Sequence, residues 1–167
     1  MESKQKEKLN RTRLLAAALG AGAFLSDLAS KQWVLTAIPF GTSIPVIPGF
    51  LDFTDVLNSG VAFSFAENYP SMIITLIAAV LACYLIYVFT RKKNPVILSG
   101  LALVIGGTLG NIFDRLVRGA VVDFIHFTLF GMSMPIFNLA DTWIFCGICI
   151  WILGEFLEEK KHDAKKH

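Results

Sequence analysis

An asparagine three residues before an aspartate occurs twice in this chain, each time in or beside a strongly apolar stretch. The first pair is Asn111 with Asp114, and the second is Asn138 with Asp141. On a helix, residues three apart lie on the same face, so each pair would present an amide beside a carboxylate. Carboxylates in an apolar environment are costly, which makes these residues candidates for a functional site.

Two such carboxylates can hydrolyse a peptide bond without a covalent intermediate. The ionised one takes a proton from a bound water, while the protonated one polarises the scissile carbonyl and then protonates the leaving amine. The two groups would share one proton and titrate as a unit, with the asparagines fixing them or the substrate backbone. A buried, hydrogen-bonded structural pair is the alternative interpretation of the same residues.

The composition indicates a membrane protein. Of the 167 residues, 54% are hydrophobic and 17% are charged, whereas a soluble domain has about 25% charged residues. Four apolar stretches are long enough to be membrane-spanning helices. We therefore expect a mainly α-helical membrane protein with a single domain over 14–157, between charged tails at 1–13 and 158–167. The predicted spans are Leu14–Ile38, Met72–Phe89, Val96–Phe113 and Phe137–Leu157.

The basic residues give these spans an orientation. Most of the 15 Lys and Arg residues lie before the first span, between the second and third, or after the fourth, and the loop at about 39–71 has none. Cytoplasmic loops are rich in Lys and Arg, so both termini are expected in the cytoplasm and loops 39–71 and 115–136 outside. The net charge of +2 is then an orientation signal and does not indicate nucleic-acid binding. A cleaved signal peptide is the alternative, but the apolar character resumes through Trp33–Leu35.

With this orientation, ionisable residues from three spans reach one level of the membrane. Asp27 and Lys31 lie roughly 21 and 27 Å along the first span from Arg13, near the outer side of a hydrocarbon core about 30 Å thick. Asp114 follows the third span and Asp141 lies in the first turns of the fourth. We therefore expect the site close to the outer membrane face.

The two outer loops are apolar and β-prone, unlike solvated linkers. Leu51–Thr54 alternates apolar and polar residues, and Val121–Phe127 is rich in β-branched and aromatic residues. We expect a small sheet on the outer face that can cover the carboxylates. Asn58 is followed two residues later by Gly60, where glycine would allow a tight turn near a substrate.

Four segments together resemble, in order, the characteristic blocks of the lipoprotein signal peptidases, or signal peptidase II. The resemblance covers essentially the whole chain apart from its charged tails. One departure is Leu57, where relatives often carry a basic residue before the asparagine. The blocks correspond to Asp27–Lys31, Asn58–Phe63, Gly106–Ile125 and Phe137–Asp141.

The resemblance implies an intramembrane aspartic endopeptidase of the bacterial inner membrane. Its fold would have four transmembrane helices with a small sheet and a short helix on the outer face. Its substrates would be prolipoproteins with a diacylglyceryl group on a Cys, and it would cut them immediately before that Cys. Membrane lipid would be its other partner. The family's catalytic pair falls on Asp114 and Asp141. Its other functional positions fall on Asp27, Lys31, Asn58, Asn111, Arg115 and Asn138.

Several of these residues keep two possible roles. Asp27 and Lys31 are four residues apart with the acid first, a favourable helical pair, which either neutralises itself in the membrane or supports the site. Arg115 would pair with an acid such as Asp123 or bind a lipid phosphate. His126 has no second His or Cys at ligand spacing, so neither a metal nor another cofactor is expected, and a monomer suffices chemically.

A small proton-coupled transporter is the main alternative function, because intramembrane aspartates also mark proton relays. A transporter would stagger its ionisable groups through the membrane and often contains internal repeats. Here the groups cluster at one level and no sequence repeat is visible. A C-x-x-C at Cys146 and Cys149 fits redox or metal chemistry, or simply two small residues packing on a helix.

Overall fold

A computed structural model describes residues 2–60 and 70–164, and it contains four helices long and apolar enough to cross a membrane. This confirms the predicted helical membrane fold. The first helix begins at Glu2 instead of Leu14, because the Lys-rich and Glu-rich tail has good helix propensity although it is not apolar. The helices are α1 (Glu2–Ala37), α2 (Pro70–Arg91), α3 (Pro95–Arg118) and α4 (Leu139–Asp163).

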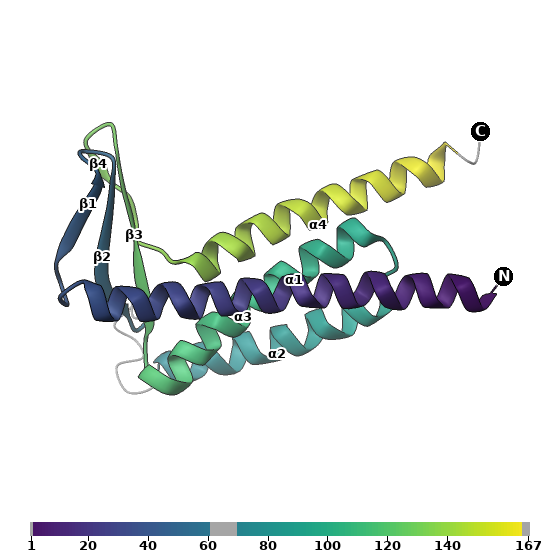
Figure 1. Cartoon of the computed structure of the whole chain (residues 1–167), viewed down its shortest axis with the longest axis horizontal. Helices are drawn as coiled ribbons and strands as arrows, with labels where there is room; N and C mark the ends of the chain where they lie inside the picture. Colours follow the sequence, from purple (N-terminus) through teal and green to yellow (C-terminus); the bar gives the residue numbers. More distant parts are fainter. Residues whose placement is uncertain (1, 61–69, 165–167) are drawn as a thin grey trace.

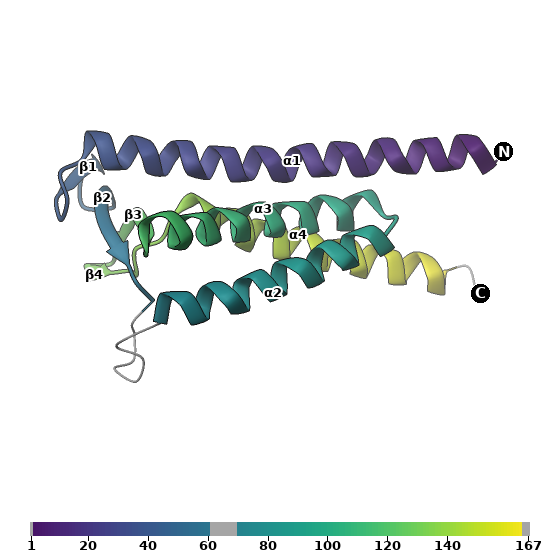
Figure 2. The same ribbon diagram turned by 90° about the horizontal axis from the view of Figure 1, so that it is seen from below.

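Helix α3 is the centre of the bundle and packs against α1, α2 and α4 (Figures 1 and 2). It has the largest buried share of the four spans, with Ile97, Leu98 and Leu101 fully buried. Asn94 caps its first turn by accepting a hydrogen bond from the Val96 backbone N–H at 3.0 Å. The remaining helices leave large apolar side chains exposed around this core, as expected for lipid-facing surfaces.

Glycines on α3 allow the neighbouring helices to approach closely. A Cβ atom at Gly106 would collide with the carbonyl oxygen of Gly20 on α1, and one at Gly107 would collide with that of Ala140 on α4. A Cβ at Gly110 would strike the carboxylate of Asp27. The G-x-x-x-G at 106 and 110 is therefore a close helix contact, and it also makes room for a buried polar side chain.

We expect Gly106→Ala to lower the thermal midpoint of the detergent-solubilised protein, because the added methyl group meets backbone and costs about 1–3 kcal/mol. Gly22→Ala is the matched control, since a Cβ there meets no atom of the described residues within 4 Å. This control variant should have the wild-type thermal midpoint or a slightly higher one. Equal midpoints for the two variants would contradict the close contact between α1 and α3.

An antiparallel sheet lies across one end of the bundle, with the strand order β1-β2-β3-β4 (Figure 1). It confirms the predicted strands of both outer loops. The described residues contain no short helix beside it, and Val61–Phe63 of the second sequence block lie outside them. The strands are β1 (Ser43–Ile47), β2 (Leu51–Asn58), β3 (Val121–Leu129) and β4 (Met132–Ser133).

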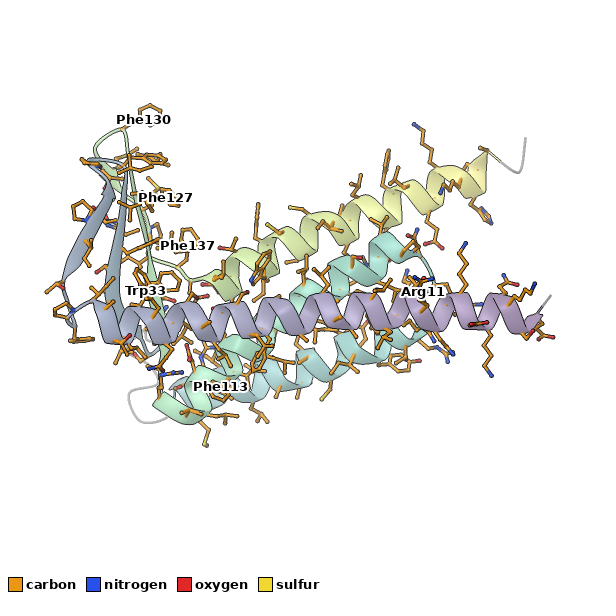
Figure 3. The ribbon with its side chains drawn as sticks, in the orientation of Figure 1. Arg11, Trp33, Phe113, Phe127, Phe130 and Phe137 are labelled. Atoms are coloured by element: carbon orange, nitrogen blue, oxygen red, sulfur yellow. The ribbon has the colours of Figure 1, made fainter. Side chains whose placement is uncertain are left out.

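Apolar packing holds this sheet against the end of α1. Val34 and Ile38 of α1 form one buried cluster with Val122 and Phe124 of β3. The Trp33 ring meets the Phe53 ring edge-on at a centroid distance of 5.6 Å. Figure 3 shows aromatic side chains such as that of Trp33 gathered at the sheet end, far from the N-terminal end of α1. This packing fixes the start of β3 against the end of the helical bundle.

Candidate active site

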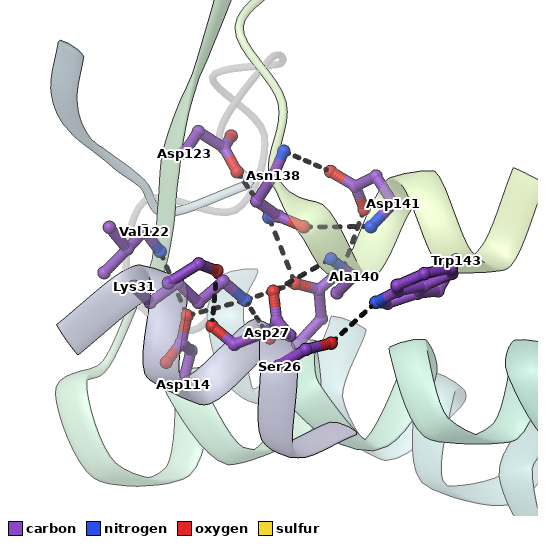
Figure 4. A network of polar contacts seen from close by, with 12 residues as sticks. Ser26, Asp27, Lys31, Asp114, Val122, Asp123, Asn138, Ala140, Asp141 and Trp143 are labelled. Carbon is purple, nitrogen blue, oxygen red and sulfur yellow. Dashed lines mark hydrogen bonds and ion pairs between the residues drawn. The ribbon is translucent and has the colours of Figure 1, made fainter. Parts of the chain in front are cut away.

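Polar side chains from α1, α3, β3 and α4 meet where the bundle joins the sheet (Figure 4). Asn58 of β2 joins them through a hydrogen bond to Asp123. The structure therefore brings together the residues that the sequence placed at one level of the membrane. Two groups of contacts can be distinguished within this network. One is a cluster of buried charges around Lys31, and the other is a pair of aspartates held by asparagines.

Lys31 is the centre of the charged cluster. Its Nζ lies 2.8 Å from Oδ2 of Asp27 and 3.0 Å from Oδ2 of Asp114, and all three side chains are fully buried. The same Nζ donates a hydrogen bond of 3.0 Å to Oδ1 of Asn111. Such a cluster is tolerated in an apolar interior only because each charge is paired.

Three groups hold the Asp114 carboxylate: Lys31, Arg118 and one backbone N–H. In addition to Lys31, the Arg118 guanidinium pairs with its Oδ1. Its Oδ2 accepts a hydrogen bond of 3.2 Å from the Val122 backbone N–H, at the start of β3. Asp114 thus carries two cationic partners and a backbone donor, and it ties the end of α3 to the following strand.

Asp141 lies in the first turn of α4, within a capping box. Asn138 is the N-cap residue: its Oδ1 accepts from the Asp141 N–H at 2.9 Å, and its own N–H donates to Oδ2 of Asp141 at 3.3 Å. The amide of Asn111 donates to Oδ1 of Asp141 at 2.8 Å. Asp27 adds a second cap, because its Oδ1 accepts from the Ala140 N–H at 2.8 Å.

Asp123, on β3, is the second aspartate of the asparagine-bound pair. Its side chain is buried and accepts hydrogen bonds from Nδ2 of Asn58 at 2.8 Å and from Nδ2 of Asn138 at 2.7 Å. Burial raises the pKa of Asp123; these two hydrogen bonds oppose the rise, and the nearby charge of Asp141 adds to it. Asn138 therefore contacts both members of the pair.

The partners of the three aspartates differ in a way that matters chemically. Asp114 is bound by two cations, whereas Asp123 and Asp141 accept from neutral amide groups and form no ion pair within the described residues. The carboxylate of Asp114 is therefore committed to neutralising two cations. Asp123, whose pKa burial raises, has no cation to neutralise and can serve in acid–base chemistry.

The other predicted residues have distinct positions in this network. Asn111 connects its two parts, since its Oδ1 accepts from Lys31 and, at 3.2 Å, from Nδ2 of Asn138. Oδ1 of Asn58 accepts from the Gly60 N–H at 2.8 Å, and Gly60 has φ of 79°, which confirms the predicted tight turn.

Arg115 does not form the predicted ion pair with Asp123. In the described part of the chain, the only hydrogen bond of its side chain is from Nη1 to the Asn111 carbonyl at 3.3 Å, and its Nε is buried without a partner. The arginine that forms an ion pair is instead Arg118, one turn later, and its partner is Asp114.

Sequence reasoning missed Arg118 and gave Asp123 no place in the site. A signal for Arg118 was present, because it follows Asp114 by four residues on a helix. Asp123 lies on a strand and reaches the site through the pairing of β2 with β3, in which it stands opposite Val56. No local spacing indicates that position.

The described residues contain no group of three or more His, Cys, Asp or Glu side chains that could hold a metal ion. Cys146 and Cys149 are free thiols on α4. Neither cysteine belongs to the hydrogen-bonded network at the sheet end.

Comparison with known proteins gives a consistent result. Residues 19–157 match the family model described as signal peptidase (SPase) II. The chain is 40% identical over 147 residues to the lipoprotein signal peptidase of Aeromonas hydrophila, covering 85% of this chain and 88% of that one. It is 34% identical over 160 residues to the lipoprotein signal peptidase of Neisseria meningitidis serogroup C, covering 93% and 96%.

Two solved structures, each described as a bacterial membrane enzyme studied by the in meso method, have the same fold. One, at 2.3 Å resolution, has a TM-score of 0.77 and 29% identity over 89% of this chain and 90% of that chain. The other, at 1.9 Å, has a TM-score of 0.75 and 31% identity over 85% and 90%. The chain therefore belongs to the signal peptidase II family of multi-pass bacterial membrane peptidases.

Proposed function

We propose that this chain removes the signal peptide from bacterial prolipoproteins whose Cys carries a diacylglyceryl group, cutting immediately before that Cys. Family membership and the names of the relatives support the substrate class. The observation that carries the proposal is the pair of aspartates held by asparagines at the junction of bundle and sheet.

The resemblance in sequence assigns the catalytic pair to Asp114 and Asp141. The geometry favours a different pair, Asp123 and Asp141, with Asp114 as the residue that positions β3. Asp114 is occupied by the buried Lys31 and the partly exposed Arg118, so protonating it would leave these cations with less compensation. Asp123 instead has a raised pKa and lies close enough to Asp141 to feel its charge.

In the proposed mechanism, a water between Asp123 and Asp141 attacks the scissile carbonyl carbon. Asp141, at the positive end of the α4 dipole, is the better candidate for the ionised member that takes the water proton. Asp123 in its protonated form polarises the carbonyl oxygen, and the proton taken from water passes to the leaving amine nitrogen as the C–N bond breaks. Because the two groups are coupled, the pair has apparent pKa values that belong to both.

The remaining residues have supporting roles in this proposal. Asn111 and Asn138 orient the two carboxylates. Asn58, Gly60 and Arg115 would contact the substrate backbone or the lipid phosphate; among the described residues, the buried Nε of Arg115 has no hydrogen-bond partner. The basic residues near both termini and between α2 and α3 support an orientation with both termini in the cytoplasm and the site near the outer face. A monomer supplies every residue.

Gel-shift cleavage of a prolipoprotein, with and without its diacylglyceryl group, tests the proposed substrate. The purified enzyme should cut the lipidated precursor and leave the unmodified one essentially intact, with the new C-terminus immediately before the Cys. Equal cleavage of both precursors would show that the lipid is not recognised. Loss of activity on treatment with a chelator would point to a metallopeptidase instead.

The pH dependence gives a second test of the dyad. We expect a bell-shaped dependence of kcat/KM on pH, in which the alkaline limb reports loss of the proton that the pair shares. Because burial raises the pKa of Asp123, this limb should lie at a higher pH than the ordinary pKa of an aspartate. Asn58→Ala removes a hydrogen bond that lowers this pKa, so the alkaline limb should move to higher pH. Ser59→Ala, an exposed neighbour, is the control and should leave the limb in place. A shift to lower pH in Asn58→Ala would contradict the role of Asp123.

A further inference from the structure

A basic groove lies at the opposite end of the bundle from the sheet. The first turns of α1 and the connection between α2 and α3 enclose a space of about 580 Å³. Lys6 and Lys8 line it from α1, and Lys93 lines it from the connection. The proposed peptidase mechanism uses none of these residues.

The length of α1 places this groove at the level of the lipid headgroups. Its 36 residues span about 54 Å at 1.5 Å per residue, whereas the hydrocarbon core of a bilayer is about 30 Å thick. The charged first turns of α1 therefore extend beyond the hydrocarbon on the side of the N-terminus. Figure 2 shows α1 continuing as a straight helix past the connection between α2 and α3.

Hydrogen bonds fix the connection, so the groove is preformed. The Arg13 guanidinium on α1 donates to the carbonyls of Thr90 at 2.5 Å and Lys92 at 3.2 Å. On the other side, Nζ of Lys92 lies 2.5 Å from Oε1 of Glu155 on α4, which also accepts from Nε1 of Trp151 at 2.9 Å. The connection is thus held between α1 and α4, and Lys93 has a defined place opposite the lysines of α1.

The lining of the groove is amphipathic. Leu9 and Pro95 provide an apolar part, whereas Lys6, Lys8 and Lys93 bring three positive charges against the single negative charge of Glu2. A free phosphate ion would use only the charges. A phospholipid would use both parts, because its phosphate meets the lysines while its glycerol and upper acyl carbons meet the apolar residues.

We propose that this groove binds the headgroup of an anionic phospholipid from the leaflet on the N-terminal side. Clusters of Lys next to a transmembrane helix attract anionic lipid, and a groove between two elements converts this attraction into a site. The bound lipid would hold the extension of α1 against the connection between α2 and α3. This site is independent of the aspartates at the other end of the bundle.

Native mass spectrometry of the full-length protein, released from nanodiscs with equal amounts of phosphatidylglycerol and phosphatidylcholine, tests the proposal. The wild type should retain phosphatidylglycerol selectively. Replacing Lys6, Lys8 and Lys93 together by Gln should reduce the retained phosphatidylglycerol by about tenfold or more, since each lysine contributes to the attraction. The matched control replaces the exposed Lys4, Arg11 and Lys160 by Gln, which changes the net charge equally outside the groove.

Three outcomes would overturn the proposal. Equal loss of lipid in the groove variant and its control would show a diffuse field of charge instead of a site. Unchanged retention in the groove variant would show that the lysines do not bind lipid. Release by inorganic phosphate at constant ionic strength would indicate a site for a free anion. Peptidase activity in phosphatidylcholine alone should be the same in all three proteins, which separates this test from that of the dyad.

Discussion

Asp123→Asn should reduce turnover of a diacylglyceryl-modified precursor by about 10³-fold or more, the loss expected when a general acid is removed. The asparagine has nearly the same shape as the aspartate but cannot hold or release the proton. Its amide oxygen can still accept from Asn58 or from Asn138, but not from both. The protein should therefore insert in the membrane and lose only about 1–3 kcal/mol of stability. Asp141→Asn should have the same effect on turnover. Single-turnover cleavage by the purified variants is the measurement.

Asp114→Asn is the decisive comparison because it separates the two possible dyads. Removing this charge leaves Lys31 and Arg118 with less compensation in a buried setting, which costs about 3–5 kcal/mol when a buried pair is broken. We expect a clear fall in the thermal midpoint and measurable residual turnover at low temperature. If Asp114→Asn is stable but inactive and Asp123→Asn is active, the catalytic pair is Asp114 and Asp141, as predicted from the sequence.

The membrane-spanning helices could be predicted because hydrophobicity is a local property of the chain. The predicted span at Val96–Phe113 became α3, extended by a turn to Arg118 because charged residues at the end of a helix can face the headgroups. The start of α1 could not be predicted in this way, since residues 2–13 are polar apart from Leu9 and their helix depends on intrinsic propensity.

The site was predictable where one element supplied both members of a contact. Asn138 and Asp141 form a capping box at the start of α4, so their spacing alone indicated that they act together. Asn111 and Asp114 have the same spacing but serve different partners: Asn111 reaches Asp141 on α4, and Asp114 reaches Lys31 on α1. Helical spacing gives a common face, but the neighbouring helices decide which residue each side chain meets.

Asp123 illustrates what spacing cannot provide. It is adjacent to Val122, whose N–H is held by Asp114, and its side chain accepts a hydrogen bond from Asn58 of the neighbouring strand β2. Its position thus depends on a residue of α3, on a second strand and on the N-cap of α4 at the same time. The sequence predicted the strand but had no means of stating which of its residues would meet the helices.

Lys31→Met should destabilise the protein by about 3–5 kcal/mol, because it leaves the carboxylates of Asp27 and Asp114 buried around an apolar side chain. Methionine is similar in length to lysine, so the effect measures mainly the charge. The measurement is the thermal midpoint in detergent. Lys92→Met is the matched control: this lysine also pairs with an acid, but the pair is partly exposed, and its loss should cost no more than about 1 kcal/mol.

A double variant decides whether Lys31 only neutralises its neighbours or also supports the chemistry. In Lys31→Met with Asp27→Asn, Asp114 keeps Arg118, so one acid and one cation remain and much of the stability should return. Activity should not return with it, because Asn111, whose Nδ2 binds Asp141, loses the charged one of the two donors to its Oδ1 and keeps only the longer bond from Asn138. Recovery of both stability and turnover would mean that the pair of Asp27 and Lys31 merely makes burial tolerable. Recovery of stability alone would make Lys31 a positioning residue, acting on Asp141 through Asn111.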